Sequence, residues 1–204
     1  MEPNSAPRRK SIRLPGYDYS EPGAYFVTIC TARHRSIFSV IVDGVVQLTP
    51  IGRIVEKCWL DIPNHFHRAQ LDAHIIMPNH IHGVILIEPN CGANKGEAFP
   101  TGIVRLDQNP GSSAPPQHVP CPGGNASPLR PVGTTSGSLG AIIQNFKAVT
   151  TRRVNQLNRT PGGILWQRNY YEHIVRYNDK LDEIRQYILA NPWNWPKDKY
   201  YINL

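Results

Sequence analysis

The stretch that decides the fold is Ala73-His74-Ile75-Ile76-Met77-Pro78-Asn79-His80-Ile81-His82-Gly83-Val84-Ile85-Leu86-Ile87. Its second half, from His80 onward, is a β-branched apolar run, which predicts a strand rather than a helix. Side chains two residues apart in a strand point to the same face of the sheet. We therefore expect His80 and His82 to stand together on one face. Ile81, Ile85 and Ile87 should lie on the opposite face, buried under helices.

The histidine pair has two interpretations. His-x-His triplets occur by chance, and histidine is often a half-buried sheet residue, so the triplet alone does not decide between structure and metal binding. The preceding Pro78-Asn79 marks a break in the chain, because proline cannot donate to a strand ladder. The position of the two imidazoles at the start of a strand favours a role as ligands of a divalent metal over a role in the core. A second triplet, His65 and His67, lies in a polar loop and is the weaker candidate.

Length, charge and cysteine spacing narrow the class of protein. A chain of 204 residues is long enough for one well-buried domain. The formal net charge of +7 suits a polyanionic partner such as nucleic acid. Neither a zinc knuckle nor a redox motif is indicated, because the four cysteines form no Cys-x-x-Cys pair: Cys30, Cys58, Cys91 and Cys121. Without a signal peptide or membrane-length apolar run, we expect a cytoplasmic protein, nucleoid-associated when bound to DNA.

The segments differ sharply in composition. Residues 89–135 contain nine prolines and seven glycines and show little periodicity, which predicts a disordered insertion. We expect one domain built from residues 24–88 and 136–196, preceded by a basic arm at 1–23 and followed by a tail at 197–204.

Within that domain, apolar periodicity and turn signals predict strands, a hairpin and helices. The expected elements are a strand at 24–31, a hairpin across Asp43-Gly44, a helix capped by Thr49, a strand at 69–77 before the histidine strand, a helix capped by Ser138 and running to about 157, a turn and strand at 164–176, and a helix at 180–191 stopped by Pro192.

The last helix carries the second half of the candidate site. Leu181, Ile184 and Ile188 form its buried stripe, and Tyr187 and Asn191, four residues apart, lie on a neighbouring face. Alone, Tyr187 would suggest a residue at the boundary between the polar and apolar faces of the helix, and Asn191 would suggest a helix cap. Beside His80 and His82, however, an asparagine oxygen gives a mixed nitrogen and oxygen ligand set with open positions, which suits Mg²⁺ or Mn²⁺ holding a phosphate oxygen. Tyr187 would then be a nucleophile one helical turn away.

Basic and aromatic side chains outside this site are candidates for DNA contacts, although a solvated surface is the default role of such residues. The candidates are Arg8, Arg9, Lys10, Arg13, Tyr17, Lys147, Arg152, Arg153 and Arg168.

The sequence resembles the REP-associated tyrosine transposases, a branch of the single-tyrosine HUH transposases of small insertion sequences. The matching segments cover nearly the whole chain except the insertion: Arg-Lys-Ser-Ile-Arg-Leu-Pro-Gly-Tyr near the N-terminus, Tyr25-Phe-Val-Thr-Ile-Cys-Thr31, Met77-Pro-Asn-His-Ile-His-Gly83, Ser138-Leu-Gly-Ala-Ile-Ile-Gln-Asn-Phe-Lys147, Trp166-Gln-Arg168 and Ile184-Arg-Gln-Tyr-Ile-Leu-Ala-Asn-Pro192. The resemblance implies an α+β fold of the ferredoxin-like or RRM-like type, an antiparallel sheet with helices packed on one face.

The resemblance also assigns roles to residues. It implies that His80, His82 and Asn191 hold the metal and that Tyr187 attacks single-stranded DNA near hairpins, leaving a 5′-phosphotyrosine and a free 3′-hydroxyl. Reversal by another 3′-hydroxyl would join strands without ATP, which is transposition chemistry. Tyr170, Tyr171 and Tyr177 are rival nucleophiles, but each lacks a ligand partner at helical spacing. The expected partner is single-stranded DNA with hairpins, and the expected oligomeric state is a monomer or homodimer.

Two other functions remain open at this point. One is a domesticated DNA-hairpin-binding protein that no longer moves DNA. The other is a metal-dependent hydrolase of RRM-like fold acting on RNA, in which no tyrosine adduct would form.

Overall fold

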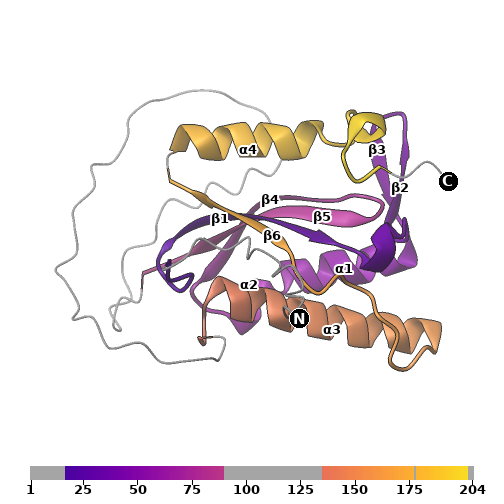
Figure 1. The fold of residues 1–204 in the computed structure, drawn as a ribbon, viewed down its shortest axis with the longest axis horizontal. Coiled ribbons are helices and arrows are strands. Elements are labelled where there is room, and N and C mark those ends of the chain that lie inside the picture. Colours follow the sequence, from indigo (N-terminus) through magenta and orange to yellow (C-terminus); the bar gives the residue numbers. More distant parts are fainter. Residues whose placement is uncertain (1–16, 90–134, 177, 202–204) are drawn as a thin grey trace, which may run out of the picture. The chain divides into compact units, whose positions relative to one another are not determined.

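A four-stranded antiparallel sheet forms the centre of the fold (Figure 1). The computed structural model describes residues 17–89, 135–176 and 178–201, all within one compact unit made of Met1–Cys91 and Thr134–Leu204. The strand order is β4-β5-β1-β6, with bounds β1 Gly23–Cys30, β4 Ala69–Ile76, β5 His80–Ile87 and β6 Tyr171–Val175. This arrangement confirms the predicted α+β class.

Strand β5 is the histidine strand, and it pairs on both sides. Its partner β1 runs alongside it from Cys30 opposite His80 to Gly23 opposite Ile87, so that Thr28 lies directly opposite His82. Strand β4 covers the other edge, with an irregular register between Leu71 and His74. The histidines therefore sit in the interior of the sheet rather than at an exposed edge.

Helices cover both faces of the sheet, rather than one face as the resemblance implied, because α4 also has an apolar stripe to bury (Figure 1). Helices α1 (Pro50–Leu60), α2 (Ile62–His65) and α3 (Leu139–Asn158) lie on one face, and α4 (Asn178–Ala190) lies alone on the other. Both predicted N-caps are present, because the Thr49 hydroxyl accepts from the Gly52 N–H and the Ser138 hydroxyl from the Ala141 N–H. The fold therefore leaves one face of the sheet to α4 and the histidines.

Alternation along the strands divides the core in two, as the sequence predicts. Ile81, Ile85 and Ile87 belong to the large cluster under α1 and α3, built around Trp59 and Phe146. The smaller cluster on the α4 side contains Phe26, Val84, Val175 and Ile188, with Leu181 and Ile184 of the helix packed against it. Burial of this stripe fixes which side of α4 faces the sheet.

The remaining elements are small. The expected hairpin forms a separate two-stranded sheet of β2 (Ser39–Val42) and β3 (Val45–Leu48). Two short 3₁₀ turns are Ala32–His34 (η1) and Trp195–Lys197 (η2). The loop expected near residue 63 instead contains the single turn of α2, because Pro63 suits the first turn of a helix.

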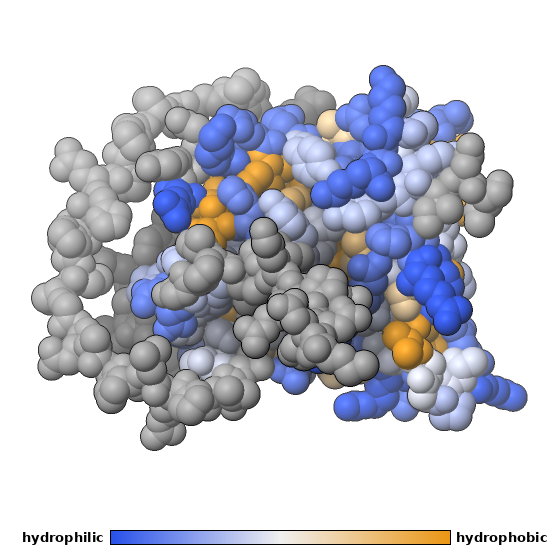
Figure 2. Space-filling view, in the orientation of Figure 1, coloured by the Kyte–Doolittle hydropathy of each residue, from blue (hydrophilic) through white to orange (hydrophobic). Residues whose placement is uncertain are grey.

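The described residues visible in Figure 2 are mainly polar. On the face in Figure 2, hydrophilic residues dominate, and apolar colour is confined to small areas. No helix within the described ranges has both the length and the apolarity that a membrane span requires.

Candidate metal and nucleophile site

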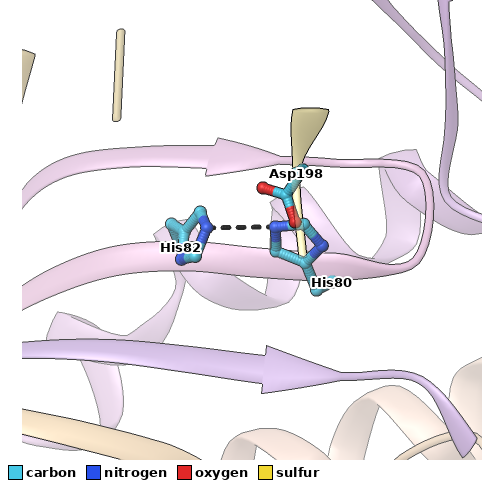
Figure 3. A group of neighbouring side chains, drawn as sticks. All are labelled: His80, His82 and Asp198. Carbon is cyan, nitrogen blue, oxygen red and sulfur yellow. Dashed lines mark hydrogen bonds between the residues drawn. The ribbon is translucent and has the colours of Figure 1, made fainter. Parts of the chain in front are cut away.

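The two histidines of β5 stand side by side, as strand alternation predicts (Figure 3). The Nε2 atoms of His80 and His82 are 3.0 Å apart, and both residues are almost completely buried. Burial lowers the pKa of His80 to about 2 and that of His82 to about 3. Both imidazoles are therefore neutral near pH 7, and their lone pairs are not lost to protons.

Neighbouring side chains fix how each ring is oriented. Asn79 donates from Nδ2 to the carbonyl of Tyr200 at 2.6 Å, so its Oδ1 faces His80 Nδ1 at 2.8 Å. Since that oxygen only accepts, His80 carries its proton on Nδ1, and its Nε2 presents a lone pair toward His82. His82 Nδ1 lies 2.8 Å from the Thr28 hydroxyl, which can donate or accept. Both rings are thus held at Nδ1 and point Nε2 toward the same place.

Helix α4 brings Tyr187 to this pair. The Tyr187 hydroxyl is 3.4 Å from His82 Nε2, and Phe26 stacks on the His82 ring while meeting the Tyr187 ring edge-on. The Tyr187 side chain is 47% exposed, so a large substrate has access to it. Burial of the hydroxyl raises the pKa of Tyr187, the charge of Asp198 raises it further, and a hydrogen bond with Asn191 lowers it.

Asn191 lies one residue beyond the end of α4. It is 2% exposed, and its Oδ1 is buried without a hydrogen-bond partner. The Asn191 side chain lowers the pKa of the Tyr187 hydroxyl, which is the effect of an amide N–H directed at the phenolic oxygen. A buried, unpaired amide oxygen is costly unless something binds it, and a cation would satisfy it.

The structure adds a carboxylate that sequence reasoning missed. Asp198 follows η2, and one atom each of His80, His82 and Asp198 lie within 4.8 Å of one another (Figure 3). Tyr200 lies against the His80 ring at a centroid distance of 4.8 Å. Residues 197–204 were expected to be a tail, and no periodicity signals their position, because the return of the chain after Pro192 depends on tertiary contacts.

This donor set fits a divalent cation. Two ligands held at right angles about 2.1 Å from an octahedral ion are about 3.0 Å apart, which matches the two Nε2 atoms. The carboxylate of Asp198 adds an oxygen donor, and the buried Oδ1 of Asn191 is the oxygen donor that the sequence predicts. Imidazole with carboxylate and amide oxygen is compatible with Mn²⁺ or Mg²⁺.

The rival tyrosines are placed differently. Tyr171 contacts the Phe26 ring edge-on at a centroid distance of 6.5 Å, so that Phe26 lies between it and His82. The Lys199 ammonium lies 5.5 Å from the centroid of the Tyr171 ring. Tyr170 lies under Lys147. Tyr177 is outside the described residues. Of the described tyrosines proposed as nucleophiles, Tyr187 is the one for which a contact with a site histidine is seen.

The predicted DNA-contact residues divide into three groups. Arg8, Arg9, Lys10 and Arg13 lie outside the described residues. Arg152 and Arg168 are exposed and remain available to a phosphate backbone.

Tyr17, Lys147 and Arg153 have partners within the fold. Tyr17 contacts the Tyr25 hydroxyl at 3.2 Å, Lys147 donates to the carbonyls of Gln167 and Asn169, and Arg153 contacts the Cys58 sulfur. Sequence periodicity placed Lys147 and Arg153 on a polar helix face, and composition placed Tyr17 in the N-terminal arm, but neither could show which groups these side chains meet.

Comparison with solved structures defines the class of fold. A REP-associated tyrosine transposase bound to a REP hairpin matches over 89% of this chain and 73% of that chain, with a TM-score of 0.51 at 12% identity. The chain therefore has a REP-associated tyrosine transposase-like fold, as its sequence motifs predict.

Sequence comparison then gives the family. No family model matches the chain. A Haemophilus influenzae protein, named only as uncharacterized, is 34% identical over 195 residues, which is 96% of this chain and 94% of that relative. The chain belongs to the same protein family as this relative.

Proposed function

We propose that the chain is a metal-dependent, single-stranded DNA endonuclease and strand transferase that uses Tyr187 as its nucleophile. The observation that supports the proposal most directly is the 3.4 Å contact between the Tyr187 hydroxyl and Nε2 of His82. A half-exposed tyrosine next to a donor set for a divalent cation is suited to attack on a phosphodiester. The proposed substrate is single-stranded DNA with hairpins, in line with the hairpin bound by the transposase of similar fold.

The roles of the residues follow from their positions. A divalent cation, Mg²⁺ or Mn²⁺, held by His80, His82 and Asn191 would polarise the scissile phosphate and neutralise developing charge. Thr28 and Asn79 hold the two imidazoles at Nδ1, so that neither ring turns away. Phe26 packs on both His82 and Tyr187 and thereby fixes the distance between ligand and nucleophile.

The reaction exchanges one phosphoester for another. The Tyr187 oxygen bonds to phosphorus, the bond to the 3′ oxygen of the preceding nucleotide breaks, and that oxygen leaves as a 3′-hydroxyl once protonated. The phenolic proton is lost during the attack, because a neutral phenol is a weak nucleophile. Since the ester to tyrosine keeps the bond energy, a second 3′-hydroxyl reverses the step and joins a new strand.

The test is a denaturing gel of purified protein incubated with labelled hairpin DNA and Mn²⁺ or Mg²⁺. We expect a protein-linked DNA band that requires metal and is absent in Tyr187→Phe. Tyr171→Phe is the matched control, because Tyr171 contacts the same Phe26 ring, and it should retain the band. Cleavage without a linked band would favour a hydrolase, and binding without cleavage would favour a hairpin-binding protein; either result contradicts the proposal.

A further inference from the structure

The chain after α4 folds back over the histidine pair and is anchored there. Trp195 and Tyr200 lie against the His80 ring at centroid distances of 5.9 and 4.8 Å. The Tyr200 carbonyl accepts from Asn79 Nδ2 at 2.6 Å, and Asn79 is the residue that orients His80. Asp198 lies between Trp195 and Tyr200, so its position is set by contacts on both sides.

We propose that Asp198 is a direct carboxylate ligand of the divalent cation bound by His80 and His82. This inference rests on the proposed function and extends its ligand set from three residues to four. Its geometric basis is that one atom from each of the three side chains lies within 4.8 Å of the others. Figure 3 shows the three side chains lying together.

Charge provides a second argument. The set His80, His82 and Asn191 has no formal charge, so a divalent ion bound by these three alone would keep its full charge in a largely buried site. Hard ions such as Mg²⁺ and Mn²⁺ are bound in proteins chiefly through carboxylates. Of the described residues, Asp198 is the acidic side chain that joins the histidines in a potential metal cluster.

The carboxylate is already oriented by the backbone. Its Oδ1 accepts from the Tyr200 N–H at 2.6 Å, which is a local turn contact of the kind that aspartate and asparagine both make. Ligating carboxylates are themselves commonly hydrogen-bonded in this way. The same contact offers a purely structural explanation for Asp198, in which the side chain only closes the turn.

Replacing Asp198 by asparagine separates these explanations. Asp198→Asn keeps the size of the side chain and an oxygen that accepts from Tyr200, but removes the negative charge. The experiment titrates the metal-free, full-length protein with Mn²⁺, without DNA, and follows binding by calorimetry. We expect the dissociation constant to rise at least tenfold in Asp198→Asn, and to rise less in Asp198→Glu, which keeps the carboxylate. Glu183→Gln removes an exposed carboxylate on α4 and should leave the affinity unchanged.

The outcomes distinguish failure of the Asp198 ligand proposal from failure of the proposed function. Equal Mn²⁺ affinity in wild type and Asp198→Asn would overturn the proposal and leave the turn as the role of Asp198. If wild type also forms the metal-dependent adduct in that case, the proposed function stands without this ligand. A wild-type protein that binds no Mn²⁺ would overturn both. Matching thermal unfolding of the metal-free variants confirms that any difference in affinity is not a loss of folding.

Discussion

At the scale of single residues, the state of the site depends on where two imidazoles carry their protons. Asn79 fixes the His80 proton on Nδ1, because its own amide is held by the carbonyls of Tyr200 and His34. Without a cation, His82 can donate from Nε2 to His80, with Thr28 donating to its Nδ1. When a cation binds, the His82 proton must be on Nδ1 and Thr28 must accept. The Thr28 hydroxyl serves both states by rotating.

We therefore predict that Thr28→Val weakens Mn²⁺ binding by about ten- to a hundredfold, the usual effect of losing a partner of a ligating histidine. Valine keeps the shape but leaves His82 Nδ1 without a partner. Calorimetric titration measures the affinity, and Thr28→Ser, which keeps the hydroxyl, should stay near wild type. Undiminished affinity in the valine variant would show that Thr28 does not support His82.

Gly83, next to the histidines, is required by packing. A Cβ at this position would lie 2.2 Å from the Trp59 ring, a fully buried side chain with no room to move. We predict that Gly83→Ala lowers the free energy of unfolding by about 1–3 kcal/mol, the typical cost of overpacking. Urea unfolding measures it. Gly23→Ala, on the adjacent strand with its nearest contact at 3.8 Å, should change little, and equal effects would contradict this explanation.

Regular spacing in the sequence made some residues of the site predictable and left others undetected. His80 and His82 come from strand alternation, and Tyr187 with Asn191 from helical spacing, because both periods are local properties of the chain. Asp198 has no such signal. It reaches the histidines only because the chain turns back after Pro192 and Tyr200 bonds Asn79, a contact across more than a hundred residues.

At the scale of elements, the position of α4 decides whether the tyrosine meets the histidines. The apolar stripe of α4 packs on the sheet, but a stripe alone allows the helix to slide. A polar contact prevents this: Arg185 donates through Nε and Nη2 to both carboxylate oxygens of Asp72 on β4. Asp72 lies in the irregular stretch between Leu71 and His74, which period-two patterning could not reveal.

We predict that Asp72→Asn lowers the rate of adduct formation by about tenfold or more, because a misplaced α4 moves the Tyr187 hydroxyl away from its attack position. Mn²⁺ affinity should fall less than the rate, since two of the four proposed ligands, His80 and His82, belong to β5 and do not move with α4. Single-turnover cleavage and calorimetry measure the two effects. Glu183→Gln, which removes the exposed ion pair with Lys180, should leave the rate unchanged. An unaltered rate in Asp72→Asn would show that the apolar stripe alone positions the helix.

At the scale of the whole molecule, the described apolar core is contributed by chain on both sides of the segment between β5 and α3. Every residue of the two apolar clusters lies between Tyr17 and Ile87 or between Leu139 and Ile188. The two ends of the gap are close in the fold. Leu139 donates to the Tyr19 carbonyl at 3.0 Å, and Gly23, four residues later, is paired with Ile87. Composition predicted an insertion here, and that prediction can be tested by removing it.

We predict that replacing residues 92–133 by a linker of about ten Gly and Ser residues leaves the fold and the tyrosine chemistry intact. Such a linker spans about 30 Å when extended. This is enough, because the described chain on the two sides of the segment lies near Tyr19 and Gly23, which are only four residues apart. Circular dichroism during thermal unfolding and the adduct assay measure the outcome. A linker variant that unfolds in the same range but loses hairpin selectivity would assign the segment to DNA recognition. A variant that fails to fold would show that the segment belongs to the core.

In the proposed reaction, Tyr187 forms the covalent bond to DNA. The most direct measurement is peptide mass spectrometry of the wild-type protein after reaction with a hairpin substrate, Mn²⁺ and nuclease trimming, which identifies the tyrosine that carries the nucleotide. We expect a 5′-linked nucleotide on the peptide containing Tyr187, with Tyr171 unmodified. A nucleotide on Tyr170, Tyr171 or Tyr177, or cleaved DNA with no modified tyrosine, would contradict it.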